Sequence, residues 1–408
     1  MTPRGLLFYG LFGMPLAMLA LPIYVYVPQF YAQRGSLTLA VIGSALLAAR
    51  TAAAFIDPLL GWWIARSGGA YARFVALALP LLLLGYGALF HPPAQGGGLA
   101  WFLGALMLVY LGFGMATIAH QSWGAALTQR PGERARLAAV REGCGLLGVM
   151  TAAAVPALAG YAALSVSFAV ILLLAAAVLL RKAPRPGTVL PAAGDAAMGA
   201  DSVLLPFRQA RFRWLFAVLL VNGVAASIPA TLFLFFAEDR LRLGASAGLF
   251  LLLYFASAAA SMAVWPAIAA RIGEARAWMA SMLTTAAVFV WAYGLGAGDS
   301  VSYACICALS GLALGADLAL PPALLAATIA RAGHSGRREA AYVGVWNWGV
   351  QMTLALAAGV ALPALEWLGY RPNTQQGLAA LSFAYALLPC GLKLLAAAML
   401  WRAPLHDD

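Results

Sequence analysis

The sequence predicts an all-α protein that crosses a membrane many times. Of its 408 residues, 63% are hydrophobic and only 10% are charged, whereas soluble domains average about 25% charged residues. Long apolar runs recur along the whole chain, and the mean hydropathy is +0.87. Because these runs are continuous rather than alternating, they indicate membrane-spanning helices and not a β-barrel.

Twelve apolar runs are long enough to span a bilayer. A polar, proline-rich stretch at 181–210 separates them into two sets of six and has the composition of a linker. We therefore expect two pseudo-symmetric six-helix bundles, an N-terminal one at 1–180 and a C-terminal one at 211–408. The expected spans lie at roughly 6–30, 38–65, 72–90, 99–127, 138–161, 164–180, 212–236, 246–270, 276–296, 302–330, 341–366 and 376–401.

The basic residues predict the orientation of these spans. If the N-terminus is cytoplasmic, most of the 25 lysines and arginines lie in cytoplasmic segments, as the positive-inside rule requires. The opposite side then holds Arg34, Arg240, Arg242 and Arg371. We expect both termini on the cytoplasmic side of a bacterial-type inner membrane. The net charge of +11 then reflects orientation, and no nucleic-acid partner is expected.

Motifs of soluble catalysis give no support for an enzyme. The sequence has no Walker A loop for ATP and no His-Glu-x-x-His metal motif. All four cysteines fall inside apolar runs, where a small buried side chain is the more frequent use of cysteine. We expect neither catalytic residues nor a metal or organic cofactor.

The second apolar run contains two opposite charges. Arg50 and Asp57 are seven residues apart, so they share a helix face at a separation of about 10 Å. An acid in mid-span costs about 2.5–3.5 kcal/mol on insertion scales, and such residues usually have a function. Asp57 is therefore a candidate proton site that Arg50 tunes. The alternative is a static ion pair that holds this helix to its neighbours.

The second half of the chain also carries charges inside its apolar runs. Asp317 is followed by Pro321 and Pro322, which we expect to break or kink the helix beside it. Asp317 is then a candidate coupling residue, with a capping role at the kink as the alternative. Lys393 in the last run either reaches the membrane surface with its ammonium group or pairs with Asp317.

Polar and aromatic side chains in the apolar runs are candidates for solute binding. Aromatic rings stack on flat apolar faces, and two amides four residues apart bind hydroxyls or a carboxylate. Helix–helix contacts are the commoner use of such residues. The candidates are Tyr24, His120, Gln121, Trp123, Trp346, Asn347 and Gln351.

Glycines and charges near the cytoplasmic ends are candidates for gating. A mixed cluster follows the fourth span and indicates a latch between helices, with a solvated loop as the alternative. The gating and latch candidates are Gly61, Arg66, Arg134, Arg141 and Lys393.

Four segments carry a family resemblance: Arg50–Gly61, Trp123–Gly143, Gly315–Ala327 and Gly344–Asn373. Together with the six-plus-six arrangement, they resemble the major facilitator superfamily, and within it the glycoside–pentoside–hexuronide:cation symporters of the melibiose permease type. The resemblance implies two six-helix bundles, alternating access, and uptake of a sugar-like solute driven by a cation.

At several positions the chain differs from that family pattern. Pro15, Ala53 and an apolar position in the fourth span occupy places where such symporters carry acids, and Gln351 replaces a lysine. Because a sodium site needs several oxygen ligands, we expect H+ rather than Na+ as the coupling ion.

The expected function is therefore proton-coupled symport of a sugar or other small polar organic solute, by a monomer in the lipid bilayer. The alternatives are a carrier of a lipid-like or amphiphilic solute, and a non-transporting membrane sensor or scaffold.

Overall fold

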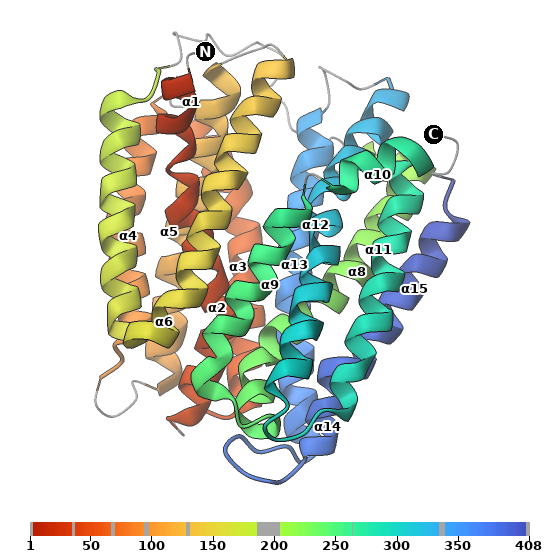
Figure 1. Ribbon diagram of the computed structural model, residues 1–408. Coiled ribbons are helices and arrows are strands. Elements are labelled where there is room, and N and C mark those ends of the chain that lie inside the picture. The colour runs from red at the N-terminus through yellow and green to blue at the C-terminus, as the bar shows by residue number, and fades with distance from the viewer. Residues whose placement is uncertain are drawn as a thin grey trace. The chain divides into compact units, whose positions relative to one another are not determined.

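The computed structural model describes residues 3–34, 37–66, 70–93, 98–127, 131–185, 205–262, 264–333 and 339–404. Within these ranges the chain is helical and forms no strand, so the predicted all-α fold class is confirmed (Figure 1). The chain divides into two compact units, Met1–Ala196 and Ala197–Asp408. The exact limits of the linker stay a prediction, because 186–204 lie outside the described residues.

In its described residues the first unit contains six helices, and a glycine lies at the junction end of each of the first two. Helix α1 ends at Gly10 and α2 begins at Gly13, and both glycines lie directly against the backbone of α6 at Val140 and Arg141. A side chain at either glycine would collide with α6, so glycine permits this close approach. The helices are α1 (Pro3–Gly10), α2 (Gly13–Gln33), α3 (Leu39–Arg66), α4 (Tyr71–Phe90), α5 (Gly98–Leu127) and α6 (Pro131–Lys182).

Helix α6 is two spanning helices joined at a glycine. Its apolar part, Val140–Lys182, has 43 residues, and one bilayer crossing needs only about 20. At Gly160 the backbone leaves the helical region with φ 79° and ψ 178°, and the ribbon of α6 turns back on itself (Figure 1). The described residues contain 11 helices long and apolar enough to cross a membrane. Two crossings in α6 reconcile that number with the twelve predicted spans.

The second unit has its main core between α8, α11, α12, α13 and α15, where Phe212, Trp278 and Tyr342 are fully buried. Its helices are α8 (Ala210–Phe235), α9 (Ala247–Ser261), α10 (Val264–Ile272), α11 (Glu274–Phe289), α12 (Ser300–Arg331), α13 (Glu339–Trp367), α14 (Leu378–Ser382) and α15 (Leu388–Arg402). Short 3-10 or π turns are η1 (Leu205–Arg208), η2 (Phe236–Arg240), η3 (Gly244–Ser246), η4 (Val290–Gly294) and η5 (Phe383–Leu387).

The structure differs from one predicted span and from one predicted effect of proline in this unit. The span expected at 246–270 consists of two helices, α9 and α10, and Pro266 lies in the first turn of α10, where a missing N–H is tolerated. Pro321 and Pro322 do not break α12, which is continuous from Ser300 to Arg331, so the predicted break was wrong and the predicted kink stays a prediction. Neighbouring helices can hold such a proline-containing helix together.

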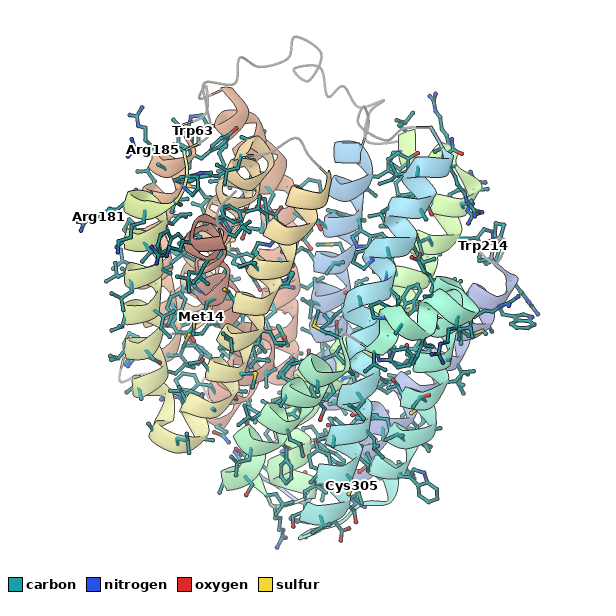
Figure 2. All side chains as sticks on the ribbon, turned by 45° about the horizontal axis from the view of Figure 1, so that its top comes forward. Met14, Trp63, Arg181, Arg185, Trp214 and Cys305 are labelled. Carbon is teal, nitrogen blue, oxygen red and sulfur yellow. The ribbon has the colours of Figure 1, made fainter. Side chains whose placement is uncertain are left out.

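The surfaces of both units suit a hydrocarbon environment. Large apolar side chains are exposed, including Phe55 at 76% and Leu158 at 77%. Arg181 lies in the last turn of α6 and Arg185 just beyond its end, and both extend away from the first unit (Figure 2). Lipid contact accounts for so much exposed apolar surface, which water would disfavour.

Candidate functional site: a polar cluster inside each unit

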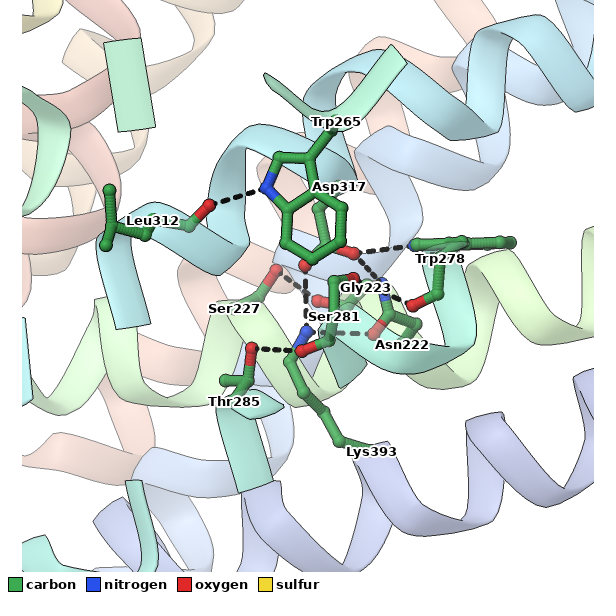
Figure 3. A network of polar contacts seen from close by, with 10 residues as sticks. All are labelled: Asn222, Gly223, Ser227, Trp265, Trp278, Ser281, Thr285, Leu312, Asp317 and Lys393. Atoms are coloured by element: carbon green, nitrogen blue, oxygen red, sulfur yellow. Dashed lines mark hydrogen bonds and ion pairs between the residues drawn. The ribbon is translucent and has the colours of Figure 1, made fainter. Parts of the chain in front are cut away.

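A buried ion pair lies at the centre of a polar cluster in the second unit (Figure 3). Lys393 Nζ of α15 is 2.8 Å from Asp317 Oδ2 of α12, and the two side chains are only 6% and 13% exposed. The pairing alternative for Lys393 is therefore the one that the structure shows. Because both charges are removed from water, neither is stable there without the other.

Two uncharged side chains complete this cluster. Asn222 of α8 donates to Asp317 Oδ1 at 3.0 Å and accepts from Lys393 Nζ at 3.0 Å. The indole Nε1 of Trp278, on α11, donates to the same Asp317 Oδ1 at 2.7 Å. The carboxylate of Asp317 thus accepts three hydrogen bonds from three different helices, and the Asn222 amide bridges both members of the ion pair.

Pro321 and Pro322 leave α12 unbroken but remove two backbone hydrogen-bond donors close to Asp317. In an α-helix the N–H of residues 321 and 322 would bond to the carbonyls of Asp317 and Leu318. Pro321 and Pro322 have no N–H, so these two carbonyls lose their helical donors. The helix therefore offers backbone acceptors beside the Asp317 carboxylate.

The sequence did not point to Asn222 or Trp278. Asn222 is an isolated amide in an apolar run, which is a weak signal that was available. Trp278 has no distinguishing neighbour in the sequence, and only the packing of α11 against α12 brings its indole to Asp317.

In the first unit, Arg50 and Asp57 do not pair with each other. Arg50 Nε donates to the hydroxyl of Tyr110 on α5 at 3.3 Å, and its Nη1 is buried without a hydrogen-bond partner. Asp57 lies against Gly114 of α5, where any side chain would collide with the Asp57 carboxylate. Both side chains belong to the described residues and form no ion pair there, so the static-pair alternative is wrong for this conformation.

His120 and Trp123 make contacts within the first unit. His120 is fully buried, its ring stacks on Tyr9 of α1 at 4.3 Å, and its Nε2 lies 3.0 Å from the Tyr9 carbonyl oxygen. Trp123 Nε1 donates to the carbonyl of Pro184 at 2.9 Å. These contacts tie α5 to α1 and to the chain that follows α6, which is the helix-packing alternative.

The other binding candidates lie in different environments. Trp346 belongs to the buried core of the second unit, whereas Asn347 beside it is exposed. Gln351, Gln121 and Tyr24 are half-buried. Solute binding by any of these five residues stays a prediction.

The gating candidates are described only in part. Arg141 forms an ion pair with its neighbour Glu142 at 2.7 Å, within α6. That pair lies within one helix, and the latch role of Arg141 stays a prediction, because the side chains of 131–136 lie outside the described residues. The side chains of Arg66 and Arg134 lie outside the described part of the chain, and a side chain at Gly61 would meet no atom within 4 Å.

Several solved transport proteins have a similar fold. The chain is similar to the nucleoside transporter NupG, with 15% identity, 100% of both chains covered and a TM-score of 0.74. It is also similar to a D-xylose-proton symporter, with 13% identity, 99% and 97% covered and a TM-score of 0.72. A peptide transporter POT mutant has 17% identity, 99% and 96% covered and a TM-score of 0.69. At these identities the likeness shows the fold.

No curated protein matches the sequence. A family model described as MFS/sugar transport protein, however, matches residues 8–407, which is nearly the whole chain. The narrower likeness to melibiose permease-type symporters stays a resemblance. Because this match covers nearly the whole chain, the chain belongs to the MFS/sugar transport family of membrane transporters.

Proposed function

We propose that this transporter couples the uptake of a sugar or other small polar organic solute to the movement of protons. The observation that carries the proposal is the buried Asp317–Lys393 ion pair. Burying both charges costs desolvation free energy, and the pair has a role in coupling if it opens during the transport cycle.

The chemistry of the cluster supports proton exchange at Asp317. Protonation would cancel the charge that attracts Lys393 and would leave the ammonium and the Asn222 amide seeking new partners. Hydroxyl groups of a solute are suitable acceptors for both donors. Binding of a proton and binding of a solute would then favour the same conformational state, which is the requirement for coupling.

Sodium is a poorer fit to this cluster than a proton. Asp317 Oδ1 already accepts from Asn222 and Trp278, and Oδ2 accepts from Lys393. A sodium ion would have to displace these donors and find further oxygen ligands. Asp57, which lies against α5 in the first unit, is the second carboxylate that we assign to proton coupling.

We also propose the membrane, the oligomeric state and the orientation of the transporter. We place a monomer in a bacterial-type inner membrane with both termini in the cytoplasm, on the basis of the basic residues in the sequence. Cysteine labelling of single exposed positions in intact cells tests this orientation.

The experiment compares two modes of transport in proteoliposomes, after a thermal-shift screen of sugars, organic acids and lysolipids has supplied a solute. Asp317→Asn mimics a permanently protonated carboxyl group. It should retain solute exchange across the membrane but lose accumulation driven by a pH gradient. The matched control is Asp299→Asn, which alters an exposed acid just before α12.

Two results would count against the proposal. One is gradient-driven accumulation by Asp317→Asn at the wild-type level. The other is a folded wild-type protein that binds or moves lysolipids and no polar solute, which would favour the amphiphile carrier.

A further inference from the structure

A buried guanidinium with an unused donor lies inside the first unit. Arg50 is only 7% exposed, and its Nη1 has no hydrogen-bond partner. Leaving a buried donor unsatisfied is unfavourable, and more so when the group is charged. A ligand that supplies the missing acceptor would recover this free energy on binding.

In the described part of the chain, no carboxylate forms an ion pair with Arg50. Arg50 Nε donates to the neutral hydroxyl of Tyr110, whose ring centroid is 5.3 Å from the guanidinium carbon. Tyr24 of α2 also interacts with the Arg50 charge. Asp57 lies two helical turns away against Gly114 and forms no ion pair with Arg50. Among the described residues, Arg50 therefore has a neutral hydrogen-bond partner and no ion pair.

The face of α5 toward Arg50 carries a second unused polar atom. Tyr110, Gly114 and Thr117 are spaced by four and three residues, so they share one face of the helix. The Thr117 hydroxyl oxygen is buried and has no hydrogen-bond partner. Three polar groups therefore lie along this face of α5. The Arg50 guanidinium of α3 lies at Tyr110, the Asp57 carboxylate of α3 lies at Gly114, and the third group is the hydroxyl of Thr117 itself.

We propose that Arg50 binds a carboxylate of the transported solute, so that the solute class is a small hydroxylated organic anion rather than a neutral sugar. Arginine is the residue best suited to a carboxylate, because its planar donors match the two oxygens. Tyr24 and Tyr110 flank the carboxylate, and Thr117 bonds to a hydroxyl group of the solute. This inference rests on the proposed function, whose solute it specifies.

The test measures binding to the purified protein by thermal shift at neutral pH, with no gradient applied. The probes are four matched pairs that differ only in a carboxylate or a hydroxymethyl group: gluconate and glucitol, glycerate and glycerol, lactate and propane-1,2-diol, and benzoate and benzyl alcohol. At least one acid should raise the Tm while its alcohol does not. Arg50→Gln should weaken that binding about 10- to 100-fold, as expected for a hydrogen bond between charged groups.

Two further variants separate binding from folding. Arg50→Lys retains the charge and should lose less affinity than Arg50→Gln. Arg34→Gln is the matched control, since Arg34 is exposed at the end of α2 with its guanidinium over the Phe30 ring, and it should bind as the wild type does. Without ligand, Arg50→Gln should be at least as stable as the wild type, because it removes a buried charge without a counter-ion.

The proposal is overturned if no acid in the four pairs stabilises the protein, if an alcohol stabilises it as well as its acid, or if Arg50→Gln binds normally. A large loss of ligand-free stability in Arg50→Gln would also overturn it, since that result assigns Arg50 a structural role. Because binding is measured without a gradient, a failure of proton coupling would leave this result unaffected.

Discussion

At the scale of single residues, the molecule keeps its charges buried by pairing or surrounding them with polar groups. Lys393 pairs with one carboxylate oxygen of Asp317, and Asn222 and Trp278 donate hydrogen bonds to the other. The sequence identified both charged residues and offered their pairing as one of two alternatives. It did not identify Asn222 or Trp278, because contacts between helices depend on how each helix is rotated.

Replacing Lys393 should show how much this polar cluster contributes to the stability of the fold. Lys393→Met leaves the Asp317 carboxylate buried without its cation, and breaking a buried ion pair in this way costs about 3–5 kcal/mol. Thermal unfolding in detergent, followed by tryptophan fluorescence, measures the effect. The double variant Lys393→Met/Asp317→Asn should recover part of the loss. Lys182→Met, at the exposed end of α6, should unfold at nearly the wild-type temperature.

At the scale of helices, a few residues decide where the chain turns and where it continues. Hydropathy placed most helices correctly, as α4 shows at Tyr71–Phe90 against an expected 72–90. The effects of proline were less predictable from the sequence. Pro266 lies in the first turn of a new helix, whereas Pro321 and Pro322 lie within a continuous one. The difference depends on the packing of neighbouring helices, which the local sequence does not contain.

The turn inside α6 should depend on glycine at position 160. Its backbone has φ 79° and ψ 178°, a region that other residues occupy only under strain. Gly160→Ala should therefore lower the free energy of unfolding by about 1–3 kcal/mol, although a side chain there would meet no atom within 4 Å. The measurement is urea or thermal unfolding in detergent.

The matched control for this change is Gly143→Ala in the same helix. Gly143 also has open space around it but keeps an ordinary backbone conformation, so alanine should be neutral or mildly stabilising there. Equal effects of the two alanines would contradict the account of the turn.

A hydrogen-bonded contact between η2 and the segment after α13 should stabilise one end of the second unit. Asp239, in the π turn after α8, accepts hydrogen bonds from the Tyr370 hydroxyl and from the backbone N–H of Asn373. Burial and the hydrogen bond to Asp239 raise the pKa of Tyr370 well above its usual value, so this tyrosine stays neutral and keeps donating.

Tyr370→Phe should reduce the free energy of unfolding by about 1.5–3 kcal/mol, the usual range for a hydrogen bond to a charged group. Hydrogen exchange should increase in both η2 and the segment after α13. Tyr293→Phe removes an exposed hydroxyl and serves as the control. Unchanged exchange in Tyr370→Phe would show that the contact does not hold these two segments together.

At the scale of the whole molecule, composition and charge distribution predicted more than individual residues did. Hydropathy predicted the all-α membrane fold and the twelve crossings, and the family match confirmed the transporter class. Site residues were harder to predict, because the same polar side chain serves helix packing or solute binding. Trp123 bonds to Pro184 rather than facing an open site, whereas Arg50 retains an unused donor.

The central claim is that protons, through Asp57 and Asp317, drive solute uptake. The most direct measurement is uptake into proteoliposomes under a proton gradient or a sodium gradient, with the wild type and with Asp57→Asn. We predict accumulation that follows the proton gradient, does not change with sodium and is lost in Asp57→Asn. Accumulation driven by sodium at constant pH, or full proton-driven uptake by Asp57→Asn, would contradict the claim.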